Sequence, residues 1–194
     1  MSDPAAHDRF RRSPLFFAPF AFFAVNPSVA DEVILGLGAN VGDPLAQLAQ
    51  AVERLREVIE VTGVSGVYRT PPEGFVDQPD FYNLVVIGRS AAPTGSILAE
   101  VLRIERELGR TRTFRNAPRT IDIDILAHGA RELRTPDLDV PHPRLHERAF
   151  VLVPLAEVAP HWRHPVLDRT AGSLLADLSP ASRIERVGTL PDPA

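Results

Sequence analysis

The chain has 194 residues, of which 44% are hydrophobic, and a formal net charge of −4. This size and composition suit one globular domain with a buried core, and the charge excludes a general attraction to nucleic acid or anionic membranes. All 21 basic residues are arginine and cysteine is absent, which excludes disulfides, thiolate metal sites and a lysine-containing phosphate loop.

Residues 1–31 are expected to be an extension outside the domain, which we place at 32–190. Three arginines precede an apolar run, Leu15–Val25, as they do in a secretory signal. The run is too short to span a bilayer, and Pro19 interrupts it. We favour a non-essential extension, and a cleaved signal peptide is the alternative.

The first part of the domain follows the pattern strand, helix, strand, strand. Val33–Gly38 predicts a buried strand, and Asp43 followed by Pro44 predicts the cap and first residue of a helix. Two β-prone segments, 62–68 and 81–88, flank a Pro-rich loop. The buried face of the helix is expected to contain the apolar residues at helical spacing: Leu45, Leu48, Ala49, Val52, Leu55 and Ile59.

The next part adds a helix and a strand. Thr94–Leu108 is periodic and is closed by Gly109. A polar, arginine-rich loop, 110–118, contains little apolar surface, so we expect it to be mobile without ligand and to close over one. The strand predicted at 120–127 alternates isoleucine with aspartate.

The C-terminal part begins with a turn at 128–130 that leads into a short return strand. Pro-rich turns and an apolar run follow, then a helix near 170–178 and a last strand near 183–187. Taken together, the order of elements predicts an α+β protein, a ferredoxin-like βαββαβ sandwich with an additional C-terminal helix and strand.

Asp122 and Asp124 are the sharpest local feature. Residues two apart in a strand project from the same face, so the two carboxylates repel each other unless a cation lies between them. Mg²⁺ prefers such oxygen ligands, and a phosphate can complete its shell. The alternative is an ordinary half-exposed strand. Phosphoryl transfer is favoured by the arginines that approach this strand: Arg110, Arg112, Arg115 and Arg119.

The glycines near the start of the domain do not have the spacing of a dinucleotide-binding loop. Gly36, Gly38 and Gly42 are therefore assigned to a strand end and a tight turn.

Four motifs together resemble the signature of the 6-hydroxymethyl-7,8-dihydropterin pyrophosphokinases, over about residues 33–159. They are Leu37–Asn40 (LGAN), Tyr68–Pro72 (YRTPP) with Gln78–Asn83 (QPDFYN), Arg115–Asp124 (RNAPRTIDID) and Val140–Phe150 (VPHPRLHERAF). The resemblance implies transfer of pyrophosphate from ATP to hydroxymethyl-dihydropterin with release of AMP, a step of folate biosynthesis. It also implies two Mg²⁺ ions as cofactors.

The resemblance implies the following site residues. The catalytic group comprises Asp122, Asp124, Arg110, Arg115 and Arg119, with both aspartates holding the metal ions. Pterin binding would involve Thr70, Pro71, Pro72, Phe81, Asn83 and Phe150. ATP binding would involve Glu105, Arg110, Arg112, Arg119, His142 and Arg148. The chain departs from the family pattern at Asn116–Ala117, where Trp-Gly is common, and at Leu102, where a polar residue can occur.

Two other functional classes remain as alternatives. A ferredoxin-like RNA-binding module would need exposed aromatic residues and a basic face, and the chain is acidic overall. A phosphohydrolase would need no clamp for a flat ring. We expect a cytoplasmic protein, because the implied reaction consumes ATP. We also expect a monomer whose partners are the small molecules ATP and hydroxymethyl-dihydropterin, and neither nucleic acid nor membrane.

Overall fold

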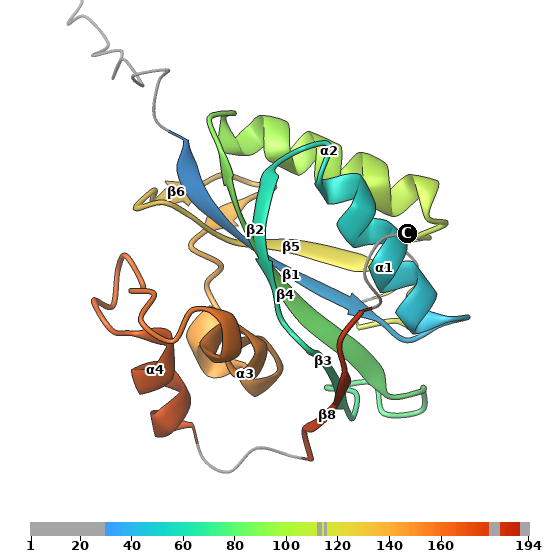
Figure 1. Cartoon of the computed structure of the whole chain (residues 1–194). Coiled ribbons are helices and arrows are strands. Elements are labelled where there is room, and N and C mark those ends of the chain that lie inside the picture. The colour runs from blue at the N-terminus through green and yellow to red at the C-terminus, as the bar shows by residue number, and fades with distance from the viewer. Residues whose placement is uncertain (1–29, 112–113, 115, 179–182, 191–194) are drawn as a thin grey trace, which may run out of the picture.

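The computed structural model describes residues 30–111, 114, 116–178 and 183–190 (Figure 1). Residues 1–29 of the predicted extension and the loop residues Arg112 and Arg115 lie outside this range. The boundary predicted at residue 31 is one residue late, because Asp31 is the first residue of β1. The elements, in chain order, are β1 (Asp31–Ala39), α1 (Pro44–Leu55), β2 (Glu60–Val64), β3 (Val67–Thr70), β4 (Phe81–Ser90), α2 (Thr94–Glu107), β5 (Asp122–His128), β6 (Leu133–Arg134), β7 (Asp139–Val140), a 3-10 turn (Leu145–Glu147), α3 (Ala149–Val158), α4 (Ala171–Asp177) and β8 (Glu185–Gly188).

The main sheet has six strands in the order β5-β1-β4-β3-β8, with β2 also pairing with β4. Every pairing in it is antiparallel. The order βαββαβ is confirmed, with one refinement. The β-prone segment predicted at 62–68 forms two strands, β2 and β3, separated at Ser65 and Gly66. The Ser65 hydroxyl accepts from the Val85 N–H at 2.9 Å and so holds this break against β4.

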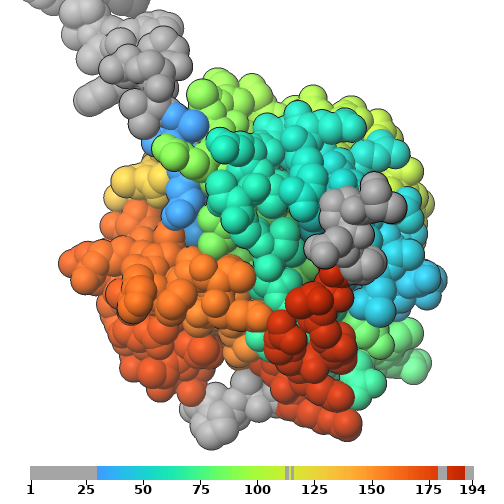
Figure 2. Space-filling model, viewed as in Figure 1, coloured from blue at the N-terminus to red at the C-terminus, as the bar shows by residue number. Residues whose placement is uncertain are grey.

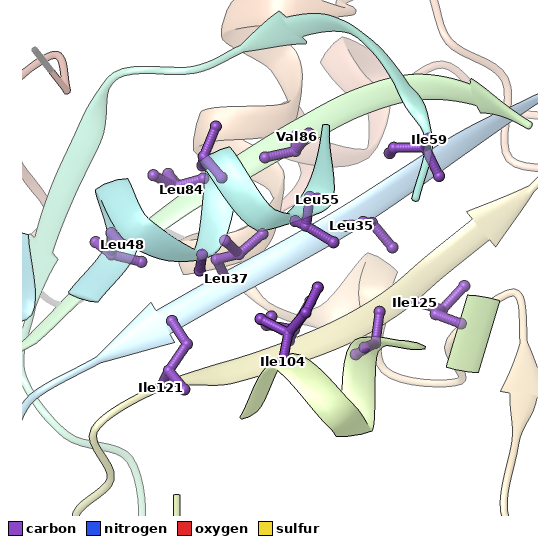
Figure 3. Close-up of a cluster of buried hydrophobic side chains, with 14 of the residues drawn as sticks. Leu35, Leu37, Leu48, Leu55, Ile59, Leu84, Val86, Ile104, Ile121 and Ile125 are labelled. Atoms are coloured by element: carbon purple, nitrogen blue, oxygen red, sulfur yellow. The ribbon is translucent and has the colours of Figure 1, made fainter. Parts of the chain in front are cut away.

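Helices cover both faces of the sheet: α1 and α2 lie on one face, and α3 and α4 lie on the other (Figure 1). Because side chains alternate along a strand, Leu35 and Leu37 of β1 enter the first core and Ile34 enters the second. Figure 3 shows the first core, in which the leucines of α1 meet those of the strands. Each fully buried leucine or isoleucine contributes about 1.5–3 kcal/mol.

Helix α1 begins as predicted, because the Asp43 carboxylate accepts from the Ala46 N–H at 3.1 Å and Pro44 occupies the first turn. Its buried residues are Leu48, Ala51, Val52 and Leu55. The inclusion of Leu45 was wrong, because it is 45% exposed in the first turn, and Ala49 is only partly buried. Ile59 is buried beyond the end of the helix, against Gly88.

The C-terminal part has one helix more than predicted, because the apolar run at 150–155 belongs to α3, which precedes the predicted helix. The short strand β6 pairs with β7 in a separate two-stranded sheet. Helix α4 and strand β8 lie close to their predicted positions, and β8 pairs with β3. Figure 2 shows the β8 segment on the surface beside the α3–α4 segment. Within the described ranges, no helix is both long and apolar enough to cross a membrane.

Candidate active site

A cavity of about 1210 Å³ occupies the part of the second sheet face that the core around α3 and α4 leaves uncovered. It continues past the edge strand β5 to helix α2. Twelve of the proposed site residues line it: Thr70, Pro71, Phe81, Asn83, Glu105, Arg110, Arg119, Asp122, Asp124, His142, Arg148 and Phe150. Pro72 does not line the cavity.

The register of three strands builds the floor of the cavity. Asp122 of β5 lies opposite Gly38 of β1, which lies opposite Asn83 of β4. One step along, Asp124 lies opposite Gly36. The assignment of Gly36 to a strand end was therefore wrong, whereas Gly38 is the last residue but one of the strand. They lie inside β1, and the missing side chains leave the space between the aspartates and β4 open.

The fit at Gly38 is tight. A Cβ atom there would lie 2.9 Å from the Asn83 Oδ1, closer than real Cβ contacts. The Asn83 Nδ2 donates to the buried Thr70 hydroxyl at 2.9 Å, which fixes the orientation of the amide. Glycine at position 38 therefore makes room for a polar group that is held in one orientation.

Arginines surround Asp122. One carboxylate oxygen pairs with Arg110 and the other with Arg119. Arg110 also pairs with Glu105, whose carboxylate is 2% exposed and accepts from the Ile123 N–H at 2.8 Å. Helix α2 and strand β5 thus share one network of ion pairs. Arg110 and Arg119 of this network line the cavity, where an anionic ligand would bind.

Asp124 lies in a different electrostatic environment. Burial, and after it the charge of Asp122, raises the pKa of Asp124 to about 6, against the opposing effects of Arg148 and Arg110. A hard cation between the two carboxylates would offset both effects. In the part of the chain that the structure describes, no group of three or more His, Asp or Glu side chains could hold a metal ion. Two carboxylates supply only part of the ligand shell of a hard cation, so Asp122 and Asp124 fit a cation that keeps water or phosphate oxygens as its other ligands.

Two arginine–phenylalanine contacts line the cavity. The Arg119 guanidinium lies over the Phe81 ring at 5.1 Å, and the Arg148 guanidinium lies over the Phe150 ring at 5.4 Å. Burial, and after it Arg144, lowers the pKa of Arg148. Each phenylalanine predicted to bind the pterin ring is therefore in contact with an arginine predicted to bind ATP.

His142 is held neutral at physiological pH. Burial, followed by Arg148 and Arg144, lowers its pKa to about 4. Its Nδ1 accepts from the Arg144 N–H at 3.2 Å, so the ring proton lies on Nε2. The backbone N–H of His142 donates to the Leu126 carbonyl at 2.8 Å, which anchors this segment to β5. The preceding Val140–Pro141 bond is cis.

The part of the cavity beside α2 includes an apolar wall, of which the family resemblance indicated only Leu102, on the nucleotide side. Leu98, Ala99 and Leu102 line it together with Leu138. Helical periodicity assigns Leu98 and Leu102 to a core, because a helix face that lines a cavity has the same apolar spacing as one that packs on a sheet.

Comparison with known proteins identifies the family. Residues 34–160 match the family model described as 7,8-dihydro-6-hydroxymethylpterin-pyrophosphokinase (HPPK). The chain belongs to this family. The pyrophosphokinase of Methylorubrum extorquens is 47% identical over 156 residues, which cover 79% of this chain and 96% of that one. The pyrophosphokinase of Aquifex aeolicus is 40% identical over 134 residues, covering 69% and 84%.

The fold is also that of solved HPPK structures. The crystal structure of wild-type Plasmodium falciparum HPPK-DHPS with pteroate matches with a TM-score of 0.62 and 18% identity, over 76% of this chain and 42% of that chain. The chain thus spans less than half of that longer protein, and this likeness concerns the fold alone. Membership of the HPPK family confirms the resemblance that the four sequence motifs indicate.

Proposed function

We propose that this protein transfers the pyrophosphate group of ATP to 6-hydroxymethyl-7,8-dihydropterin, giving AMP and the pterin diphosphate, a step of folate biosynthesis. The observation that carries the proposal is a single cavity that combines the Asp122–Asp124 pair and its arginines with Asn83 and two phenylalanines. A phosphohydrolase has no need of the second group, and an RNA-binding module has no need of the first.

The triphosphate is assigned to the cationic part of the cavity. Arg110, Arg119 and Arg148 face it, and the neutral His142 supplies an Nε2–H donor. Within the described residues, the Nε–H groups of Arg119 and Arg148 are buried without a hydrogen-bond partner, so each is available to a phosphate oxygen. Arg112 and Arg115 are assigned here by the resemblance alone.

Magnesium fits the two carboxylates, and we assign two ions to them, as the family resemblance implies. Bound there with ATP, the ions would neutralise the charge of the phosphate oxygens and help to orient the triphosphate for attack. A cation at Asp122 would compete with Arg110 and Arg119 for the carboxylate, and the phosphates of ATP would be new partners for those two arginines. One set of ion pairs would then replace another, and no buried charge would be left without a partner.

The pterin is assigned to the slot lined by Phe81 and Phe150. Two aromatic faces suit a flat heterocycle, and the Asn83 amide and the Thr70–Pro71 segment lie at its edge. The Thr70 hydroxyl accepts from one of the two N–H groups of the Asn83 amide, and the Asn83 Oδ1 is left to accept from a ring N–H. Pro72 is retained only as a part of the motif.

The apolar wall of Leu98, Ala99, Leu102 and Leu138 is assigned to the adenine ring. With both ligands placed in this way, the pterin hydroxyl oxygen attacks the β-phosphorus. The bond from that phosphorus to the α-phosphate oxygen breaks, AMP leaves and the hydroxyl proton is released. The side chains of the cavity hold the two reactants together, and most of the rate enhancement comes from this positioning and from charge neutralisation.

A direct assay tests the reaction. The purified chain is given ATP and Mg²⁺ with or without hydroxymethyl-dihydropterin, and AMP and the pterin diphosphate are measured. We expect equal amounts of both products, formed only when the pterin is present. AMP or ADP formed at the same rate without the pterin would favour a phosphohydrolase instead.

We also propose that the protein is a cytoplasmic monomer whose domain starts at β1. The Asp31 carboxylate accepts from Arg131 at 2.7 Å, so the domain includes this residue. A protein shortened to begin at Asp31 should be folded and as active as the full chain. An insoluble or inactive shortened protein would contradict a dispensable extension, and recovery of a cleaved chain outside the cytoplasm would support the signal peptide.

A further inference from the structure

Asn40 lies just beyond the last residue of β1 and does not line the cavity, yet its side chain connects the two loops that do. It is 3% exposed. Its Nδ2 donates to the Gln78 Oε1 at 2.9 Å and to the Pro79 carbonyl at 3.0 Å. Its Oδ1 accepts from the Arg119 N–H at 2.8 Å, and its own N–H donates to the Arg119 carbonyl at 3.1 Å.

Gln78 continues the connection. Its Nε2 donates to the Phe75 carbonyl at 2.5 Å and to the Asn116 carbonyl at 3.0 Å. Two amide side chains therefore bind the loop at 71–80 to the loop that ends at Arg119. Neither side chain reaches the cavity, so direct ligand contact does not explain why this many donors and acceptors are satisfied here.

We infer that Asn40 is a positioning residue that sets the separation between the pterin part and the phosphate part of the site. The Thr70–Pro71 segment begins the first loop, and Asn40 holds that loop near its end at Pro79. On the other side, Asn40 clamps both backbone polar groups of Arg119, whose guanidinium pairs with Asp122 and covers Phe81. The inference rests on the proposed function, because it assigns Asn40 to the two substrates of that reaction.

The physical reason is the sensitivity of group transfer to placement. A misplacement of about 1 Å can cost about a hundredfold in rate. The buried Asn40 amide joins the end of β1 to the loop at 71–80 and to Arg119. Moving either segment away would leave a buried donor or acceptor unpaired, at a cost of about 1–3 kcal/mol, so the segments stay in place. Loss of Asn40 should therefore slow the transfer step and affect the binding of either substrate much less.

The test compares Asn40→Ala with Thr94→Val, a matched control. Thr94 is 2% exposed and its hydroxyl bonds the His128 Nδ1 at 2.9 Å, so this variant also loses a buried hydrogen bond. We expect Asn40→Ala to lower kcat by about 10- to 100-fold while each substrate's Kd changes less than about threefold. Thr94→Val should keep kcat within about twofold. Equal kcat losses in the two variants would overturn the inference.

A second readout needs no substrate. Hydrogen exchange at the Arg119 amide, followed by NMR, should speed up at least about tenfold in Asn40→Ala, because its acceptor is gone. Asn40→Asp keeps an oxygen there and should restore protection to within about threefold of the wild type. Unchanged exchange in Asn40→Ala would reject the clamp. If the wild type forms no AMP, the proposed function fails, and the exchange data still decide whether Asn40 holds Arg119.

Gln78→Ala completes the experiment. Because Asn40 and Gln78 form one bridge, the double variant should be no slower than Asn40→Ala alone. A loss equal to the product of the two single losses would show two independent contributions and would overturn the shared bridge. Asn40→Ala could fail to fold, and Gln78→Ala then replaces it, because Gln78 is only partly buried and its loss should be tolerated. In that case, an unchanged kcat in Gln78→Ala would contradict the inference.

Discussion

The two faces of the central sheet are built from alternate residues of the same strands and serve different purposes. Toward α1 and α2, strand β1 presents Val33, Leu35 and Leu37, which are almost fully buried in the first hydrophobic core. On the other face it presents Ile34 to a second core, and then Gly36 and Gly38 to the cavity. The comparison teaches that stability and chemistry can be separated residue by residue along a single strand.

The largest effect is expected on the cavity face. Asp122→Asn should lower kcat by at least about 10²- to 10³-fold, because it removes a charge that a cation needs while two arginines stay beside it. The thermal unfolding midpoint should move by only a few degrees. AMP formation and a melting curve measure the two quantities, with Glu53→Gln on the exposed surface of α1 as the charge-removal control. A folded variant with a near wild-type rate at limiting Mg²⁺ would remove Asp122 from the metal site.

The first hydrophobic core should show the opposite behaviour. Leu55→Ala removes a fully buried side chain of α1 and should lower the free energy of unfolding by about 2–5 kcal/mol. The rate per folded molecule should stay within about twofold. Urea unfolding and an assay normalised to folded protein check this. A large loss of kcat with little loss of stability would show that the two faces are not separate.

A smaller effect tests the space left by glycine. The Cβ in Gly38→Ala would lie 2.9 Å from the Asn83 Oδ1 and should displace that amide, weakening pterin binding by about tenfold. Gly63→Ala is the matched control, because a Cβ at this site in β2 meets nothing within 4 Å. Calorimetric titration with the pterin measures both. Equal affinities in the two variants would mean that the Asn83 amide does not bind the pterin.

The smallest effect concerns the acid dependence of stability. Burial alone would raise the pKa of Glu157, but hydrogen bonds from Arg186, from the Gly66 N–H and from the Tyr68 hydroxyl lower it below its ordinary value. Because its folded pKa is depressed, Glu157 stabilises the protein above the unfolded pKa of about 4.3, and this stability is lost as the pH falls through the folded pKa.

Glu157→Gln should therefore slightly lower the free energy of unfolding at pH 7. The variant should also lose less of its stability than the wild type as the pH falls from about 5 to the folded pKa of Glu157. Urea unfolding across this pH range measures the difference between variant and wild type. If the difference in unfolding free energy between variant and wild type were the same at every pH, the charge of Glu157 would not contribute to the contact between α3 and β8.

Much of the site could be predicted from the sequence because its signals are local. Strand periodicity places Asp122 and Asp124 on one face, and Asp43 caps its helix through a bond within its own turn. The four motifs indicate the family without reference to the fold, and family membership is confirmed. These features depend on residues a few positions apart, so a pattern in the chain is sufficient to detect them.

Only the tertiary structure decided the features that depend on long-range contacts. Strand register brings Gly38 between Asp122 and Asn83, and nothing within β1 specifies that pairing. Asn40 meets Arg119 across 79 positions of sequence, because two loops converge beyond the end of β1. The leucines of α2 that line the cavity have the same spacing as core residues. Sequence thus determined most of the elements and the chemistry that they bear. Packing determined which side chains meet, because contacts between distant segments leave no periodic pattern in the sequence.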